Sequence, residues 1–306
     1  MCDECSRKFE GGIKAMNTPE LNRNLLVDAT WLADHLDDPD LLIFDTTTLL
    51  VPDPELEYRV EGDQDGYLAG HVSGAAYLNC QDDLSITPHE FRFTLPEPAD
   101  FAAKAGALGI SDNHRVVLYS RTQPFWSTRA WWSLYAMGFE GAMVLDGGYA
   151  AWVDSGHPVS TTPQEYAAAT FTAAPRHDVI FGKEDVLAVL DKPEVAVVNA
   201  LSAEQFTGSG GMAFGRAGRI TNSVNVPYAE VCDMATGVFS DAATLKAMFE
   251  SAGATPDRKI VNYCGGGISA TLGFFAQKAL GYEDLALYDA SMQEWGKDES
   301  LPMEKD

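Results

Sequence analysis

One cysteine stands in a setting that suits nucleophilic chemistry. Cys264 directly follows the apolar run KIVNY at residues 259–263, and helix-spaced apolar residues begin near position 269. The loop between them consists of Gly265, Gly266, Gly267, Ile268 and Ser269. A Gly-rich loop that leads into a helix N-terminus presents backbone N–H groups that stabilise negative charge. Such a cradle favours the thiolate, the nucleophilic form of cysteine, and would also hold a persulfide.

The other four cysteines have no comparable setting. Cys80 and Cys232 are typical of core or surface residues, and Cys2 and Cys5 form a CxxC without the second pair that would complete a metal site. We therefore expect no metal site at these cysteines. An odd number of cysteines does not form a disulfide framework, which indicates a reducing compartment. On this motif alone, Cys264 could also be an inert buried residue in a strand-to-helix turn.

Two other uses of a Gly-rich loop fit the residues poorly. A phosphatase of related fold needs an arginine six residues after its cysteine to hold phosphate, and residue 270 is alanine. A dinucleotide-binding loop needs GxGxxG in register after the strand, which is missing here. Both functions are therefore disfavoured.

The chain contains an internal repeat. Its anchor residues keep one order in both halves: Leu36, Pro39, Asp45, Gly70, Ser120, Asp146 and Trp152 correspond to Leu190, Pro193, Asn199, Gly218, Cys264, Asp289 and Trp295. A length of 306 residues is also about twice that of an ordinary domain of roughly 150 residues. The sequence thus predicts a duplicated domain.

Each copy has the pattern of an α/β domain. Short apolar runs such as LLIFD and VAVVN read as buried parallel strands, and helix-spaced segments, for example 28–36 and 242–252, alternate with them. We expect a mostly parallel sheet flanked by helices on both faces, with ligands beyond the carboxyl ends of the strands. The predicted division is an extension at 1–24, a first domain at 25–158, a linker at 159–178 and a second domain at 179–306.

The charge balance narrows the choice of partners. Forty-five acidic against 21 basic residues give a formal charge of −24, which repels nucleic acid and anionic lipid surfaces. No apolar run resembles a signal peptide or reaches the 18 or so residues of a membrane helix. We expect a cytoplasmic protein without nucleic-acid or membrane partners.

Several motifs in order resemble those of tandem rhodanese-type sulfurtransferases. They are CGGGIS followed by LYDASMQEW at 287–295, GHVSGAAYLN at 70–79 and RAWWSLYAMGFEGAMVLDGGYAAW at 129–152, and the resemblance covers roughly residues 25–300. It implies two rhodanese-like domains, of which the second carries the catalytic cysteine. The first, with Ser120 in place of Cys264, would be a scaffold and cleft wall. The reaction would move sulfur from a small anionic donor to a Cys264 persulfide, and then to a thiol or cyanide, with no metal or organic cofactor.

The loop also suggests a donor. In the family, basic residues after the cysteine accompany thiosulfate, and CG-small-G loops accompany 3-mercaptopyruvate. CGGGIS is uncharged, which favours 3-mercaptopyruvate. The loop departs from that group at Gly266, where serine is usual, and at Ser269, where threonine is usual.

The family's donor-binding residues are missing after the second-domain strand. An aspartate and arginines are common there, but this chain has Asn199, Leu201 and Gln205. Arg216 and Arg219 follow nearby, in a stretch from 205 to 229 that has no acidic residue, as has 258–282. We therefore predict these two arginines as substrate-binding residues. The alternatives are that buried elements simply lack acids, and that the chain is a non-catalytic binding or redox-sensing module.

Overall fold

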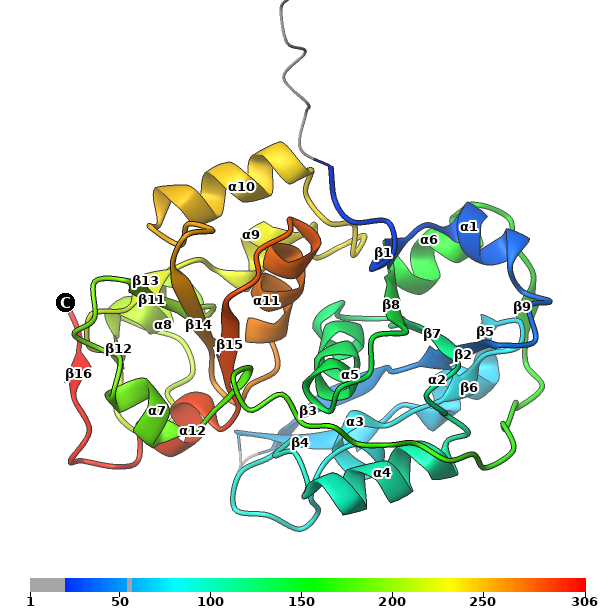
Figure 1. Cartoon of the computed structure of the whole chain (residues 1–306), viewed down its shortest axis with the longest axis horizontal. Helices are drawn as coiled ribbons and strands as arrows, with labels where there is room; N and C mark the ends of the chain where they lie inside the picture. Colours follow the sequence, from blue (N-terminus) through cyan, green and yellow to red (C-terminus); the bar gives the residue numbers. More distant parts are fainter. Residues whose placement is uncertain (1–19, 54–56) are drawn as a thin grey trace, which may run out of the picture.

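The computed structural model describes residues 20–53 and 57–306 of the chain, which form two α/β domains (Figure 1). Each domain is built on a five-stranded parallel sheet. The first has the order β1 (Leu26–Val27), β8 (Ala142–Leu145), β7 (Arg115–Tyr119), β2 (Leu41–Asp45) and β6 (Ala76–Tyr77). The second has the order β10 (Ile180–Phe181), β15 (Leu285–Tyr288), β14 (Lys259–Tyr263), β11 (Val195–Asn199) and β13 (Val224–Asn225). The two orders correspond strand for strand, as a duplication requires.

Helices flank both sheets. The first domain contains α1 (Ala29–Asp34), α2 (Gln64–Ala69), α3 (Cys80–Asp83), α4 (Pro98–Ala107), α5 (Phe125–Ala136) and α6 (Gly148–Asp154). The second contains α7 (Lys183–Leu187), α8 (Ala203–Thr207), α9 (Tyr228–Val231), α10 (Ala242–Ser251), α11 (Ala270–Ala279) and α12 (Ser291–Trp295). None of the helices in the described ranges has the length and apolar character needed to cross a bilayer. The predicted fold class, two tandem α/β domains with parallel sheets between helices, is confirmed.

Three small antiparallel pairs complete the fold. They are the hairpin of β3 (Thr48–Asp53) with β4 (Glu57–Gly62), β5 (His71–Val72) with β9 (Val159–Ser160), and β12 (Arg219–Ile220) with β16 (Met303–Glu304). The linker predicted at 159–178 therefore starts within β9. Its later residues pack along the first domain, where the Tyr166 hydroxyl accepts from the backbone N–H of Ile43 at 2.9 Å.

The central strands are apolar because both faces of each sheet are covered. All five residues of β2 and of β11 are buried, and one continuous cluster of buried apolar side chains extends through both domains. Parallel strands that are covered on both sides read as unbroken hydrophobic runs rather than as alternating ones. This is why the sequence pattern located these strands.

The two domains meet along α5 and α11, which lie side by side (Figure 1). Trp131 packs edge-to-face on Phe275, with ring centroids 4.9 Å apart, and the hydroxyls of Thr128 and Thr271 are 2.7 Å apart. Beside this contact lies a buried ion pair: Arg129 Nη1 is 2.7 Å from Asp289 Oδ1. The side chains are 1% and 11% exposed, so this pair is held almost entirely out of water.

The buried pair gives a test of how the domains are held together. Arg129→Met leaves the Asp289 carboxylate buried without its partner, which costs about 3–5 kcal/mol of unfolding free energy. We expect the midpoint of urea unfolding, followed by tryptophan fluorescence, to fall clearly. The double variant Arg129→Met/Asp289→Leu should recover part of the loss. Arg59→Gln removes a half-exposed arginine from the β3–β4 hairpin and should leave the midpoint nearly unchanged. Equal midpoints for Arg129→Met and Arg59→Gln would contradict this account.

Candidate active site

Cys264 occupies the carboxyl end of the central strand of the second sheet. It is the first residue after β14, which lies between β11 and β15. Its backbone N–H donates to Ser291 Oγ at 3.1 Å, and its carbonyl accepts from the Met292 N–H at 3.1 Å. Only 1% of the residue is exposed. The start of α12 therefore fixes the backbone of the candidate nucleophile.

The loop after Cys264 keeps its backbone donors free. In the described part of the chain, none of the N–H groups of residues 265–269 donates to a protein acceptor. The loop ends at Ser269, where the ten-residue helix α11 begins. Unengaged amides and a helix N-terminus together stabilise negative charge. The loop thus has the donors that an anionic sulfur next to it requires.

Two of the three loop glycines are required by close contacts. Gly267 has φ +72°, and a Cβ there would lie 2.2 Å from the Asp289 carbonyl oxygen. A Cβ on Gly265 would lie 2.0 Å from the Phe214 ring, which covers the loop. Gly266 differs, because a Cβ there would be 3.5 Å from the Gln293 side chain, an ordinary contact. Of the three glycines, only Gly266 could therefore be replaced by a residue with a side chain without a close contact.

A cavity of about 150 Å³ lies over Cys264 and is shared by both domains. The second domain contributes Leu201, Gln205, Met212, Phe214, Tyr228, Cys264, Gly265, Gly266, Ile268, Ser269 and Gln293. The first domain contributes Leu50, Arg92, Phe93, Phe125 and Trp126. The two acid-free stretches noted in the sequence both supply lining residues.

Residues 92–95 and Arg129 of the first domain bind the second domain around the loop after Cys264. The Gln293 side chain binds the backbone of Arg92 in both directions, accepting from its N–H at 3.1 Å and donating to its carbonyl at 3.0 Å. The Leu95 N–H donates to Asp289 Oδ2 at 3.0 Å. Arg129 donates to the Phe93 carbonyl, and also to the Gly267 carbonyl at 3.0 Å. The Arg129 side chain therefore links residues 92–95 to the loop after Cys264.

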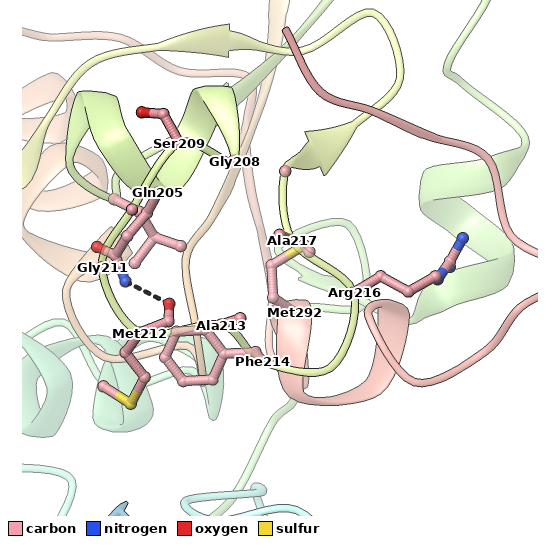
Figure 2. Close-up of a pocket in the computed structure, with 13 residues that line it drawn as sticks. Gln205, Gly208, Ser209, Gly211, Met212, Ala213, Phe214, Arg216, Ala217 and Met292 are labelled. Carbon is pink, nitrogen blue, oxygen red and sulfur yellow. Dashed lines mark hydrogen bonds between the residues drawn. The ribbon is translucent and has the colours of Figure 1, made fainter.

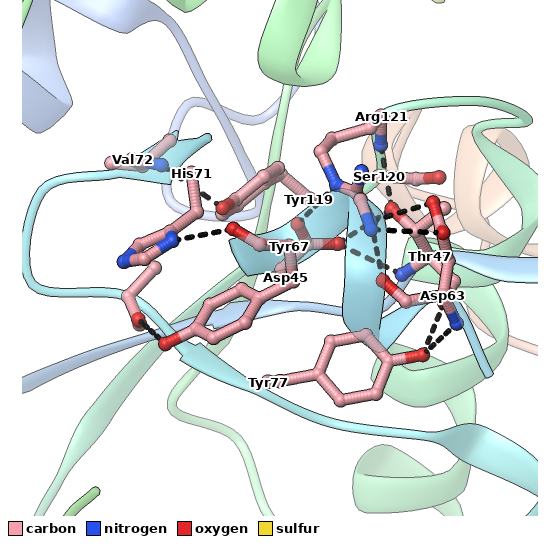
Figure 3. A network of polar contacts seen from close by, with 12 residues as sticks. Asp45, Thr47, Asp63, Tyr67, His71, Val72, Tyr77, Tyr119, Ser120 and Arg121 are labelled. Atoms are coloured by element: carbon pink, nitrogen blue, oxygen red, sulfur yellow. Dashed lines mark hydrogen bonds and ion pairs between the residues drawn. The ribbon is translucent and has the colours of Figure 1, made fainter. Parts of the chain in front are cut away.

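The corresponding place in the first domain has no such cradle. Ser120 follows β7 as Cys264 follows β14, but the next two amides are engaged: Arg121 N–H donates to Thr47 Oγ1 at 2.8 Å and Thr122 N–H to Ser120 Oγ at 3.1 Å. The Arg121 guanidinium bridges two carboxylates, Asp45 at 2.6 Å and Asp63 at 2.8 Å (Figure 3). A satisfied polar network thus fills the position that an anionic sulfur would need.

The two arginines predicted to bind substrate lie outside the set of residues lining the Cys264 cavity. Arg216 borders a neighbouring cavity, but its guanidinium points away from it (Figure 2) and donates to the carbonyls of Trp295, Gly296, Asp298 and Leu301. Arg219 pairs with Glu304 at 3.5 Å and Asp306 at 2.9 Å. Both guanidinium groups therefore anchor the C-terminal segment, and their binding of substrate stays a prediction that this geometry does not support.

Leu201, Gln205 and Asn199 stand where the family usually has residues that bind the sulfur donor, and they make other contacts here. Leu201 and Gln205 line the Cys264 cavity, and Gln205 Nε2 donates to the Met212 carbonyl at 2.9 Å (Figure 2). Asn199 is fully buried and accepts from the Leu201 N–H at 2.7 Å. This wall of the cavity is therefore neutral.

Two of the other cysteines are buried away from the cavity. Burial raises the pKa of the Cys80 thiol and that of the Cys232 thiol to about 12. Neither is therefore a nucleophile near neutral pH. Cys2 and Cys5 lie outside the described residues.

Comparisons with known proteins identify the family of the chain. A family model described as rhodanese-like domain matches residues 28–155 and again residues 183–298. The chain belongs to the rhodanese family. The 3-mercaptopyruvate sulfurtransferase of Escherichia coli K12 is 30% identical over 286 residues, which cover 91% of this chain and 97% of the relative. Thiosulfate sulfurtransferase from Bos taurus is 31% identical over 237 residues, 75% of this chain and 78% of the relative.

A solved structure supports the same assignment. The crystal structure of SseA from Escherichia coli, described as a 3-mercaptopyruvate sulfotransferase, superimposes with a TM-score of 0.77 at 27% identity, covering 87% of this chain and 98% of that one. With two matched domains and relatives that span most of its length, this rhodanese is a tandem sulfurtransferase.

Several residues of this rhodanese site were not found in the sequence. Arg92, Phe93 and Trp126 come from the first domain, and Phe214 and Gln293 from segments on either side of the catalytic loop. No local pattern marks them, because they meet only when distant segments of the chain pack together. The DASMQEW segment, already singled out as a family motif, was the one signal for Gln293.

The loop geometry predicts different responses at neighbouring glycines. Gly267→Ala must move the Asp289 backbone and strain the positive φ, so we expect kcat for sulfur transfer to fall by about 100-fold through misplacement of the loop. Gly266→Ala introduces the same methyl group at ordinary van der Waals distance from its neighbours, so the variant should retain activity within about threefold. Steady-state kinetics on both variants makes the comparison, and equal losses would contradict the described loop.

The cysteines should differ in reactivity. In a Cys2→Ser/Cys5→Ser background, iodoacetamide near neutral pH should modify Cys264. Activity should be lost at the same rate as Cys264 is modified. Cys80 and Cys232 should stay unmodified because burial holds their pKa near 12. Peptide mapping by mass spectrometry reads each site, and alkylation in urea provides the control in which all three react. Modification of Cys80 before Cys264 would contradict the assignment.

Proposed function

We propose that this sulfurtransferase carries its sulfur on Cys264 and takes it from 3-mercaptopyruvate in preference to thiosulfate. The observation that supports the carrier most directly is the run of unengaged amides from 265 to 269 beside a cysteine that faces a cavity. A persulfide extends the side chain by one sulfur and keeps its negative charge at the end. The free donors of the loop match that charge.

The first half-reaction loads the cysteine. With 3-mercaptopyruvate, the Cys264 thiolate attacks the donor sulfur, an S–S bond forms and the C–S bond breaks. The electron pair of that bond leaves on carbon, which takes up the proton from the donor thiol and gives pyruvate. With thiosulfate, the same attack breaks the S–S bond of the donor and releases sulfite.

The second half-reaction returns the cysteine to its starting state. An acceptor thiolate or cyanide attacks the outer sulfur of the persulfide, and the S–S bond to Cys264 breaks with its electron pair on Cys264 Sγ. The product is an acceptor persulfide or thiocyanate. Charge is conserved in each step, and no oxidant is needed. The amides of the loop stabilise the cysteine sulfur as the leaving group.

The preference for 3-mercaptopyruvate is supported by the uncharged loop and by the relatives. CGGGIS has no basic residue, and 3-mercaptopyruvate sulfurtransferases match over most of their length. The lining is mainly apolar, from Leu50, Phe93, Phe125, Leu201 and Phe214 among others. Such a wall suits the carbon skeleton of 3-mercaptopyruvate better than it suits thiosulfate, which is polar throughout.

We also place the protein in the cytoplasm, with small-molecule rather than nucleic-acid or membrane partners. The formal charge of −24 supports this, because it repels phosphate backbones and anionic lipids. The three cysteines in the described ranges are free thiols, which suits a reducing compartment.

Sulfur transfer from each donor to cyanide and to a dithiol tests the proposal. Wild type should favour 3-mercaptopyruvate by about tenfold or more in kcat/KM, and Cys264→Ser should be inactive because a hydroxyl cannot hold the sulfane sulfur. Cys232→Ser is the matched control, since that thiol lies outside the cavity lining, and should keep its activity. Mass spectrometry after donor alone should find one added sulfur on the peptide that contains Cys264. If neither donor loads Cys264, the non-catalytic binding or redox-sensing module replaces this proposal.

A further inference from the structure

Two uncharged hydrogen-bond donors among the residues that line the Cys264 cavity have no partner in the described part of the chain. They are the indole N–H of Trp126, from the first domain, and the hydroxyl of Tyr228, from the second. We propose that they bind the 2-oxo group of the sulfur donor and stabilise the enolate oxygen that forms when its C–S bond breaks. The inference rests on the proposed function and names the residues that favour 3-mercaptopyruvate.

The indole N–H of Trp126 opens onto the cavity. Only 1% of the residue is exposed, and Nε1 makes no hydrogen bond within the described residues. The indole nitrogen of Trp132 is sealed from water without a partner, but that of Trp126 is not, so the small exposed area of Trp126 includes Nε1. Because Trp126 lines the cavity, this area faces it. Indole N–H groups in such positions normally have a partner, which a bound ligand would supply here.

The ring of Tyr228 forms part of the cavity wall. The Tyr228 N–H donates to the Ala200 carbonyl at 2.8 Å, and the Ala200 N–H donates at 2.9 Å to the carbonyl of Tyr263, the residue before Cys264. From this anchored start of α9 the side chain reaches the first domain, where its ring meets Phe125 edge-to-face with centroids 5.8 Å apart. The hydroxyl has no partner in the described ranges and is not sealed from water. It is therefore free to donate to a ligand.

Both donors are held against the same ring. Phe125 lies 5.1 Å from Trp126 and 5.8 Å from Tyr228 between ring centroids, and all three residues line the cavity. The two donors thus flank one aromatic side chain, and each comes from a different domain. An apolar setting strengthens a hydrogen bond to a developing negative charge, because water competes less for it.

The loading reaction uses such donors at a second place besides the sulfur. In 3-mercaptopyruvate a methylene group separates the carbonyl carbon from the sulfur. When Cys264 Sγ bonds to the donor sulfur and the C–S bond breaks, its electron pair forms the C=C bond of the enolate and the carbonyl π pair moves to oxygen. The proton of the donor thiol then goes to the methylene carbon, which restores the carbonyl and gives pyruvate. Thiosulfate has no carbonyl group, so donors for an enolate oxygen favour 3-mercaptopyruvate.

Single-turnover loading without an acceptor tests the two donors. Tyr228→Phe keeps the ring and removes only the hydroxyl, so pyruvate release from 3-mercaptopyruvate should slow by about tenfold or more. Sulfite release from thiosulfate should change by less than about threefold. Trp126→Phe should show the same selectivity, and general damage from the smaller ring cancels in the ratio of the two rates. Tyr135→Phe removes a hydroxyl outside the cavity lining and should leave both rates unchanged.

Binding without turnover gives a second readout. Oxalate is a planar dianion that resembles the enolate of pyruvate. In a Cys264→Ser background we expect Tyr228→Phe and Trp126→Phe each to weaken oxalate binding by about tenfold in calorimetric titration. Equal losses of both loading rates, or oxalate binding that neither variant changes, would overturn the subsite. Weakened oxalate binding in a protein that transfers no sulfur would keep the subsite and remove the proposed function, and normal 3-mercaptopyruvate loading in both variants would do the reverse.

Discussion

The arrangement of the active site depends on the buried ion pair between Arg129 of α5 and Asp289, which follows β15. A guanidinium that is 1% exposed requires a partner for its charge, and Asp289 provides it from the other domain at 2.7 Å. The same arginine donates to carbonyls on both sides of the cavity, at Phe93 and at Gly267. Asp289 in turn accepts from the Leu95 N–H. The pair therefore fixes the domain interface, the segment that carries Arg92 and the conformation of the catalytic loop together.

The two domains show how one fold can make or abolish a thiolate site. Both sheets have the same strand order, and Ser120 and Cys264 follow corresponding strands. In the first copy Asp45 holds Arg121 in the loop, and the loop amides bind neighbouring oxygens. In the second copy Asn199 stands where Asp45 does, and the glycines that follow Cys264 leave their amides free for an anion. The difference lies in how the loop donors are satisfied rather than in the sheet.

The sequence was sufficient to predict what depends on local patterns. Buried parallel strands such as β11 and β14 are continuous apolar runs, the repeat indicates the two-domain organisation, and the position of Cys264 between a strand and a Gly-rich loop can be read from the sequence. Arg92 could not be found in this way, because it reaches the cavity only through the packing of the domains. Arg216 was chosen from charge and proximity in sequence. Charge and position in the sequence do not determine which way a side chain points. The Arg216 guanidinium donates to carbonyls at the end of α12 and in the residues that follow it.

A cavity lined by both domains has a consequence for how the site works. In this chain the second domain contributes Cys264 and the loop amides, and the first contributes aromatic walls such as Trp126. Neither domain alone encloses the cavity, so its shape requires that the domains stay docked. The interface is stabilised by apolar and aromatic contacts that are insensitive to salt, as well as by the Arg129–Asp289 pair. Because a pair this deeply buried is little screened, the two walls of the cavity should stay aligned even at high ionic strength.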